Sequence, residues 1–231
     1  MGGHTARSGR YPYAQISLAT DTGLHQCGGT LIAPDVILTA GHCHGFFTQI
    51  RVNIYNVRSS ELESFQVFKA ERMHFHPQFD ELWFRYDFLL LQLNGTVQNL
   101  EPARINSDET LPEVGDPLTV VGWGLMNPDD TTAYPDVLQE VTVSYISNDS
   151  CESTVAKGQS LYEGYIFDDM LCTKEDGKDA CSGDSGAPLV RSGNAPGEDV
   201  VVAVVSWYVR EKSLLYCRSF VKLYIDFVCS P

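Results

Sequence analysis

Short apolar runs, rich in β-branched and aromatic residues, recur along most of the chain between turn-forming residues. Many short runs at this spacing are typical of antiparallel strands in a sandwich or barrel, and not of alternating strands and helices. We therefore expect a mainly β fold. The runs cover residues 15–19, 30–32, 36–39, 50–57, 65–70, 88–93, 118–123, 139–146, 188–190 and 200–207.

Two segments interrupt this strand pattern. From Ser219 onward the apolar residues are three and four positions apart, which is typical of one face of a helix. We expect a C-terminal helix that packs on the β structure. At residues 106–114 turn-forming residues such as Ser107, Asp108 and Pro112 break the pattern. This break predicts two units, residues 1–110 and 111–231, with the helix in the second.

The composition argues against several classes of protein. A chain of 231 residues that is 43% hydrophobic can bury a substantial core. Its formal net charge of -14 argues against nucleic acid as a partner, because phosphate backbones attract basic patches. The sequence contains no run of about 18 apolar residues, so we expect no membrane-spanning segment.

Three polar residues lie in contexts that suit nucleophilic catalysis. Ser185 lies in the segment DACSGDSGAP, His42 lies in TAGHC, and Asp87 directly precedes the apolar run at 88–93. A serine hydroxyl is a weak nucleophile near pH 7, so it needs an adjacent base, and that base needs a group that orients it. Each residue alone would more often be structural. Their combination predicts Ser185 as nucleophile, His42 as base and Asp87 as the orienting group.

The chain order of these residues and the segments around them resemble the trypsin-like serine endopeptidases of the chymotrypsin fold. The resemblance covers nearly the whole chain and includes YPY at 11–13, CGGTLI at 27–32, HP at 76–77, VGWG at 121–124, LQ at 138–139 and SW at 206–207. It implies two antiparallel β-barrels with the active site in the cleft between them. His42 and Asp87 would lie on the first barrel and Ser185 on the second.

The resemblance also implies the remaining parts of a catalytic site. The backbone N–H groups of Gly183 and Ser185 would form the oxyanion hole, and Ser206 would donate a hydrogen bond to Asp87. Enzymes of this family act on polypeptides without a cofactor, and proteinaceous inhibitors bind some of them. We expect the same of this chain, as a monomer.

Substrate choice would depend on Asp179, six residues before the nucleophile. In the family that the chain resembles, an aspartate at this place forms the floor of the primary pocket and pairs with Arg or Lys of the substrate. Ser206, Trp207 and Tyr208 would line the same pocket. The alternative is an exposed loop acid, because residues 174–179 form a charged, turn-like segment.

The segment after Trp207 departs from the family pattern. The family usually has Gly where this chain has Tyr208, then a nearby cysteine and a Pro-Gly turn, whereas Cys217 comes ten residues after Trp207. A tyrosine ring facing the pocket would narrow or close it. Three explanations stay open: an altered specificity loop, a catalytically silent homologue that acts as a secreted binding module, or an error in the coding sequence at this junction.

The amino terminus is the second departure. In the family, cleavage of a zymogen frees an aliphatic residue before the pair Gly-Gly, and its amino group pairs with the aspartate that here is Asp184. Only Met1 precedes Gly2 and Gly3, so the amino group starts one residue short. We expect the natural amino terminus to lie upstream of Met1 and to arise by zymogen cleavage.

The seven cysteines suggest disulfides and an oxidising compartment. Similarity to the family implies the pairs Cys27–Cys43, Cys151–Cys172 and Cys181–Cys217. Cys229 is then left over, either as a free thiol or bonded to a cysteine outside the given chain. Sequons at Asn94 and Asn148 fit the same secretory route. We therefore expect a secreted protein.

Two arrangements of residues raise the question of a metal. His42, Cys43 and His44 group soft and borderline ligands, but zinc sites usually show two separated ligand pairs. Glu61 and Glu63 lie in a loop where some relatives bind calcium, and two acids are a weak signal. We predict no metal ion at the catalytic site, and calcium at Glu61 and Glu63 stays an open alternative.

Overall fold

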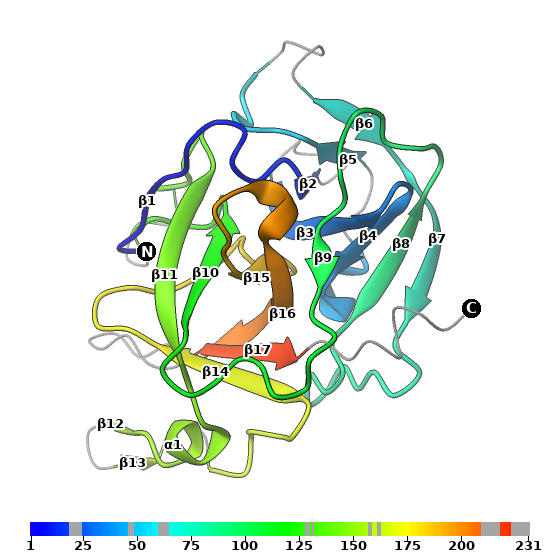
Figure 1. Cartoon of the computed structure of the whole chain (residues 1–231). Helices are drawn as coiled ribbons and strands as arrows, with labels where there is room; N and C mark the ends of the chain where they lie inside the picture. The colour runs from blue at the N-terminus through cyan, green and yellow to red at the C-terminus, as the bar shows by residue number, and fades with distance from the viewer. Residues whose placement is uncertain are drawn as a thin grey trace.

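The computed structural model describes residues 1–18, 25–45, 49–59, 65–127, 130, 132–156, 159–160, 163–208 and 218–222. These residues form two large antiparallel sheets that lie against each other, with few helical turns (Figure 1). The mainly β fold and the two-barrel class predicted from the sequence are confirmed. Among the described residues, no helix has the length and apolar character needed to cross a membrane.

The first sheet is formed by seven strands in the order β6-β5-β2-β3-β4-β8-β7. Branched aliphatic side chains alternate toward its interior, and Leu31, Ile37, Ile50 and Leu91 are completely buried there. The strands are β2 (Ala14–Leu18), β3 (His25–Ala33), β4 (Val36–Thr39), β5 (Gln49–Val52), β6 (Gln66–Phe68), β7 (Ala70–Phe75) and β8 (Leu89–Leu93).

The second sheet follows the order β1-β11-β10-β15-β16-β17-β14, and an additional pairing of β11 with β14 closes it into a ring. Its interior is filled by side chains such as Leu118, Val143, Leu189 and Val202. The strands are β1 (His4–Thr5), β10 (Pro117–Gly122), β11 (Gln139–Ile146), β14 (Met170–Lys174), β15 (Pro188–Arg191), β16 (Val200–Tyr208) and β17 (Arg218–Lys222). β9 (Arg104–Ile105) pairs in parallel with β16.

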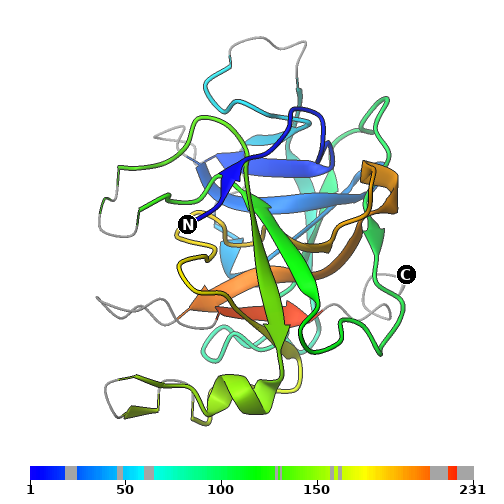
Figure 2. The same cartoon turned by 60° about the vertical axis from the view of Figure 1, so that its left-hand side comes forward.

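Small elements connect and decorate the two sheets. Helix α1 (Asn148–Glu152) begins after Ser147, whose side chain accepts a hydrogen bond from the backbone N–H of Ser150. It lies with the hairpin of β12 (Val155–Ala156) and β13 (Gln159–Ser160) at one end of the molecule, which both views show (Figures 1 and 2). Within the described residues, 3₁₀ turns cover Gly41–Cys43 and Pro196–Glu198.

Several boundaries differ from the sequence-based expectation. The strand expected at 50–57 ends at Val52, because Asn53 has a φ of 61°, outside the β region. The helix expected from Ser219 does not begin there, because residues 218–222 pair with β14 and β16 as β17. Residues 223–231 lie outside the described residues.

The division into residues 1–110 and 111–231 stays a prediction, and the two sheets follow it only in part. Most strands before residue 100 belong to the first sheet, and most later ones to the second. However, β1 pairs with β11, and β9 pairs with β16, so both ends of the first segment join the second sheet. The first segment therefore contributes one short strand from each of its ends to the second sheet.

Candidate active site

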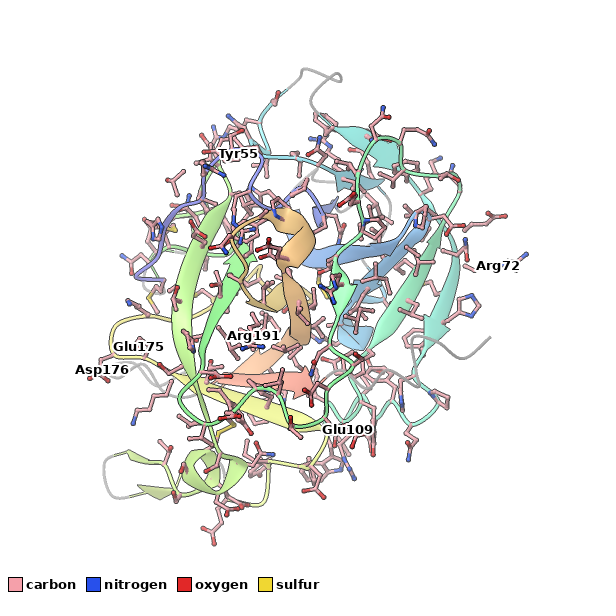
Figure 3. The ribbon with its side chains drawn as sticks, in the orientation of Figure 1. Tyr55, Arg72, Glu109, Glu175, Asp176 and Arg191 are labelled. Carbon is pink, nitrogen blue, oxygen red and sulfur yellow. A yellow bond between two sulfur atoms is a disulfide. The ribbon has the colours of Figure 1, made fainter. Side chains whose placement is uncertain are left out.

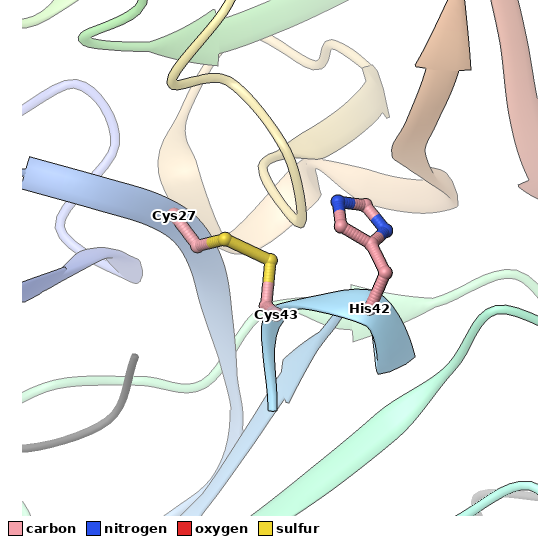
Figure 4. A group of neighbouring side chains, drawn as sticks. All are labelled: Cys27, His42 and Cys43. Carbon is pink, nitrogen blue, oxygen red and sulfur yellow. A yellow bond between two sulfur atoms is a disulfide. The ribbon is translucent and has the colours of Figure 1, made fainter. Parts of the chain in front are cut away.

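His42 lies on the 3₁₀ turn that follows β4. The disulfide Cys27–Cys43, with an S–S distance of 2.02 Å, joins this turn to β3 (Figure 4). Gly41 lets the turn approach the ring of Phe79, because a Cβ at this position would lie 2.8 Å from that ring. The side chain of His42 is about one-fifth exposed, so the ring is anchored at its base and open on one side.

Asp87 is completely buried and accepts three hydrogen bonds. The Nδ1 of His42 lies 2.7 Å from Oδ2, and the backbone N–H of His42 donates to Oδ1 at 2.8 Å. The hydroxyl of Ser206 donates to Oδ2 at 2.5 Å. A carboxylate accepts and does not donate, so it fixes the tautomer with the proton on Nδ1. The Nε2 atom is then left as the proton acceptor.

The loop that carries Ser185 lies against the segment that leads to His42. The carbonyl oxygen of Ser185 accepts from the backbone N–H of Gly28 at 2.8 Å, which joins the loop to β3. Gly186 has a φ of 77°, and a Cβ there would lie 2.2 Å from Thr39 Oγ1 and 3.0 Å from the backbone nitrogen of Ala40. The two segments are therefore in contact at Thr39 and Ala40, just before His42 in the sequence.

Ser185 itself is partly exposed. Both Ser185 and His42 are among the described residues, and the hydroxyl of Ser185 forms no hydrogen bond with Nε2 of His42. Catalytic hydrogen bonds are often long without substrate and shorten in the Michaelis complex. The structure thus brings His42, Asp87 and Ser206 into one network and places the loop of Ser185 beside it.

Asp184 fixes the shape of the nucleophile loop. Its carboxylate is buried and accepts from the backbone N–H groups of Gly124, at 2.8 Å, and Cys181, at 2.7 Å. Gly183, the next residue back, has a φ of 96°, which a residue with a side chain rarely adopts. This conformation suits a close approach of the backbone N–H groups of residues 183 and 185 to a substrate oxygen.

The amino group of Met1 does not reach the carboxylate of Asp184. It donates instead to the backbone oxygen of Asp179 at 2.5 Å, and the backbone N–H of Asp179 returns a bond to the carbonyl of Met1. A small cavity of about 20 Å³, lined by residues that include Met1, Gly124 and Asp184, lies beside this contact. The pairing of an amino terminus with Asp184 therefore stays a prediction.

Asp179 is buried, with 7% of its surface exposed, which contradicts the alternative of an exposed loop acid. The charged segment that precedes it is more accessible, because Asp176 is exposed and Glu175 is partly exposed (Figure 3). Trp207 is partly buried and packs against the disulfide Cys151–Cys172. The side chain of Tyr208 and residues 209–217 lie outside the described residues, so the narrowing of the pocket by Tyr208 stays a prediction.

The cysteines form two of the three bridges that the resemblance implies. These are Cys27–Cys43 and Cys151–Cys172. Cys181 is buried, and its expected partner Cys217 lies outside the described residues, as do Cys229, Glu61 and Glu63. His42, Cys27 and Cys43 approach within 4.8 Å of one another, but both sulfurs belong to the disulfide and cannot bind a metal as thiolates.

Sequence reasoning missed residues that surround the His42–Asp87 pair. The ring of Phe84 lies edge-on to His42, with centroids 5.5 Å apart. Asp169, from the second half of the chain, binds Arg85 and the backbone of Tyr86. A lone aspartate in a turn gives no sequence signal for a contact with a residue more than 80 positions away.

Comparison with known proteins agrees with this geometry. A sequence model of the trypsin family matches residues 1–225. Serine protease 1 of Homo sapiens is 34% identical over 211 residues, which cover 90% of this chain and 78% of that protein. Trypsin 5G1 of Aedes aegypti is 33% identical over 214 residues (90% and 74%), and trypsin of Sus scrofa is 31% identical over 210 residues (90% and 83%). The chain therefore belongs to the trypsin family and is a serine-type endopeptidase.

Proposed function

We propose that the protein is a secreted endopeptidase that hydrolyses peptide bonds after Arg or Lys through an acyl-enzyme at Ser185. The observation that carries this proposal is the buried network in which Asp87 binds both His42 and Ser206. A binding module has no physical need for a histidine whose tautomer is fixed by a buried carboxylate beside a Ser-containing loop.

In the proposed mechanism, His42 Nε2 takes the proton from the hydroxyl of Ser185 as its oxygen attacks the peptide carbonyl. Asp87 stabilises the imidazolium that forms, because its carboxylate already lies 2.7 Å from Nδ1. The imidazolium then gives the proton to the leaving amine. Water repeats these steps to release the acyl group and restore Ser185.

The negative charge on the carbonyl oxygen would be stabilised by the backbone N–H groups of Gly183 and Ser185. This role is supported by the positive φ of Gly183 and by Asp184, which holds the loop through two backbone hydrogen bonds. Preorganised donors cost no reorganisation at the moment when charge develops.

The preference for Arg or Lys rests on Asp179. Its burial six residues before the nucleophile supports a role as a fixed negative charge at the bottom of a pocket, where a guanidinium or ammonium group would neutralise it. Tyr208, in place of the usual Gly, favours a second candidate: an active protease with an altered primary preference. Cleavage of a pool of peptides that vary at the residue before the cleaved bond distinguishes a preference for Arg or Lys from an altered preference.

Secretion, a zymogen and a monomeric state belong to the same proposal. The two disulfides support an oxidising compartment. The acidic surface implied by the net charge of -14 favours basic protein partners, including proteinaceous inhibitors.

The test is rapid-mixing release of chromophore from an arginyl ester or amide, with a verified free amino terminus. A burst equal to the enzyme concentration, absent in Ser185→Ala, would support the acyl-enzyme. A matched citrulline substrate, which keeps the shape of arginine without its charge, should react far more slowly if Asp179 forms an ion pair with the substrate. Equal rates for the two substrates would reject the proposed preference, and equal rates for wild type and Ser185→Ala would reject the function.

A further inference from the structure

The turn that precedes Asp87 and positions it beside His42 has an unfavourable backbone conformation. Phe84 has a φ of 52° and Tyr86 a φ of 48°, so two residues with large side chains occupy the left-handed region on either side of Arg85. The backbone N–H of Phe88 then bonds to the carbonyl of Tyr86 at 2.7 Å, which tightens the chain around Asp87. Such a conformation persists only where surrounding contacts hold it.

Asp169 supplies such contacts from the other sheet. It directly precedes β14, and its side chain is completely buried. Its Oδ1 accepts from Nε of Arg85 at 3.0 Å and lies 3.0 Å from the NH2 nitrogen of the same guanidinium. Its Oδ2 accepts from the backbone N–H of Tyr86 at 2.7 Å. One carboxylate therefore fixes two consecutive residues of the turn, immediately before Asp87.

Aromatic contacts hold the same turn in the same place. The guanidinium of Arg85 lies over the ring of Phe167, 4.6 Å from its centroid. The ring of Tyr86 is stacked on His76 with centroids 4.6 Å apart and an interplanar angle of 6°. Asp169 thus holds the backbone while rings on both sides limit sideways movement.

We propose that Asp169 is a positioning residue for catalysis. From the second half of the protein, it anchors the strained turn in the first half that aligns Asp87 with His42. The kinetic consequence rests on the proposed function. The structural consequence does not, because the hydrogen bond between His42 Nδ1 and Asp87 exists whether or not the protein turns over a substrate.

Asp169→Asn tests this proposal, since it keeps the size of the side chain and removes its charge. The matched control is Asp199→Asn. Asp199 is also completely buried and paired with an arginine, Arg10, but its hydrogen bonds go to Arg10, Tyr13 and Gly193 and not to the turn. Both variants lose a buried ion pair, so both should unfold at lower urea concentration than wild type.

The discriminating readout is the downfield proton NMR resonance of the His42 Nδ1–H that bonds to Asp87. Asp169→Asn should shift or broaden this resonance, whereas Asp199→Asn should leave it unchanged. With an active enzyme, Asp169→Asn should lower kcat by about 10- to 100-fold with little change in KM, because a small misplacement of a catalytic group has effects of that size. Asp199→Asn should keep the wild-type kcat.

A second variant covers the case in which Asp169→Asn does not fold. Arg85→Gln removes a partly exposed partner, keeps Asp169, and should move the same resonance by a smaller amount. An unchanged resonance in whichever of these two variants folds would overturn the proposal, as would an equal change in Asp199→Asn. A wild-type protein that shows the resonance but no burst would reject the proposed function and leave this structural result standing.

Discussion

The ion pair between Arg10 and Asp199 provides a stability prediction that can be worked out from its contacts. The guanidinium of Arg10 donates to both oxygens of Asp199, at 2.5 and 2.7 Å, and to the carbonyl of Gly193 at 2.9 Å. The side chains are 12% and 0% exposed, and the hydrogen bond to Asp199 raises the pKa of Arg10. Arg10→Met removes these bonds and leaves a buried carboxylate behind.

Removing one partner of a buried pair costs about 3–5 kcal/mol. The lower end applies here, because Asp199 keeps the hydroxyl of Tyr13 at 2.6 Å and the backbone N–H of Gly193 at 2.8 Å. We therefore expect Arg10→Met to lower the free energy of unfolding by about 3 kcal/mol, measured by urea denaturation at pH 7 with the disulfides intact.

A double-mutant cycle isolates the interaction from lost packing. Arg10→Met combined with Asp199→Asn removes both charges, so its loss should be smaller than the sum of the two single losses by about 2 kcal/mol. Additive losses in the cycle, or a loss below about 1 kcal/mol for Arg10→Met, would refute the view that Arg10 and Asp199 stabilise the folded protein as a buried ion pair.

Three further predictions concern titration, backbone strain and glycosylation. Burial lowers the pKa of His76, so protonation of His76 favours the unfolded state. The contribution of neutral His76 to stability is therefore present above about pH 6.5 and is lost as pH falls. In urea titrations, His76→Gln should flatten the dependence of the free energy of unfolding on pH. Gly186→Ala should destabilise by about 1–3 kcal/mol more than Gly9→Ala, because both glycines have positive φ but only Gly186 lacks room for a Cβ; equal losses would contradict this. In secreted material, peptide mass mapping should find glycan on Asn94, because that side chain is exposed. It should find none on Asn148, because the amide of Asn148 donates to two backbone carbonyls. Glycan on Asn148 would contradict this prediction.

Much of the fold could be predicted because period-two alternation and turn residues carry strong local information. The strands at 36–39 and 139–146 were predicted with their observed bounds. β7 was missed because nearly all of its residues are exposed, so no alternation marks it. The expected start of the terminal helix at Ser219 was wrong, because residues 218–222 pair with β14 and β16, and these tertiary contacts overrode the local spacing.

The residues of the candidate site could also be predicted only in part. His42 and Asp87 could be identified because nucleophilic catalysis demands particular residue types in particular contexts, and the structure joins them by a hydrogen bond. The burial of Asp179 was expected from the family resemblance, which places an aspartate six residues before the nucleophile in the primary pocket, although its own segment looked exposed. Asp169 could not be found in this way, because its role depends on a packing contact between sheets that no sequence motif encodes.

Labelling of Ser185 by a fluorophosphonate tests the central claim most directly, because such a reagent reacts rapidly only with a serine whose proton is taken by a positioned base. Intact-mass measurement and peptide mapping should show one adduct, on Ser185, in wild type, and a greatly slowed reaction in the variants His42→Ala and Asp87→Ala. Folded wild type with a verified amino terminus that stays unlabelled, or that reacts at the same rate in His42→Ala, would contradict the account.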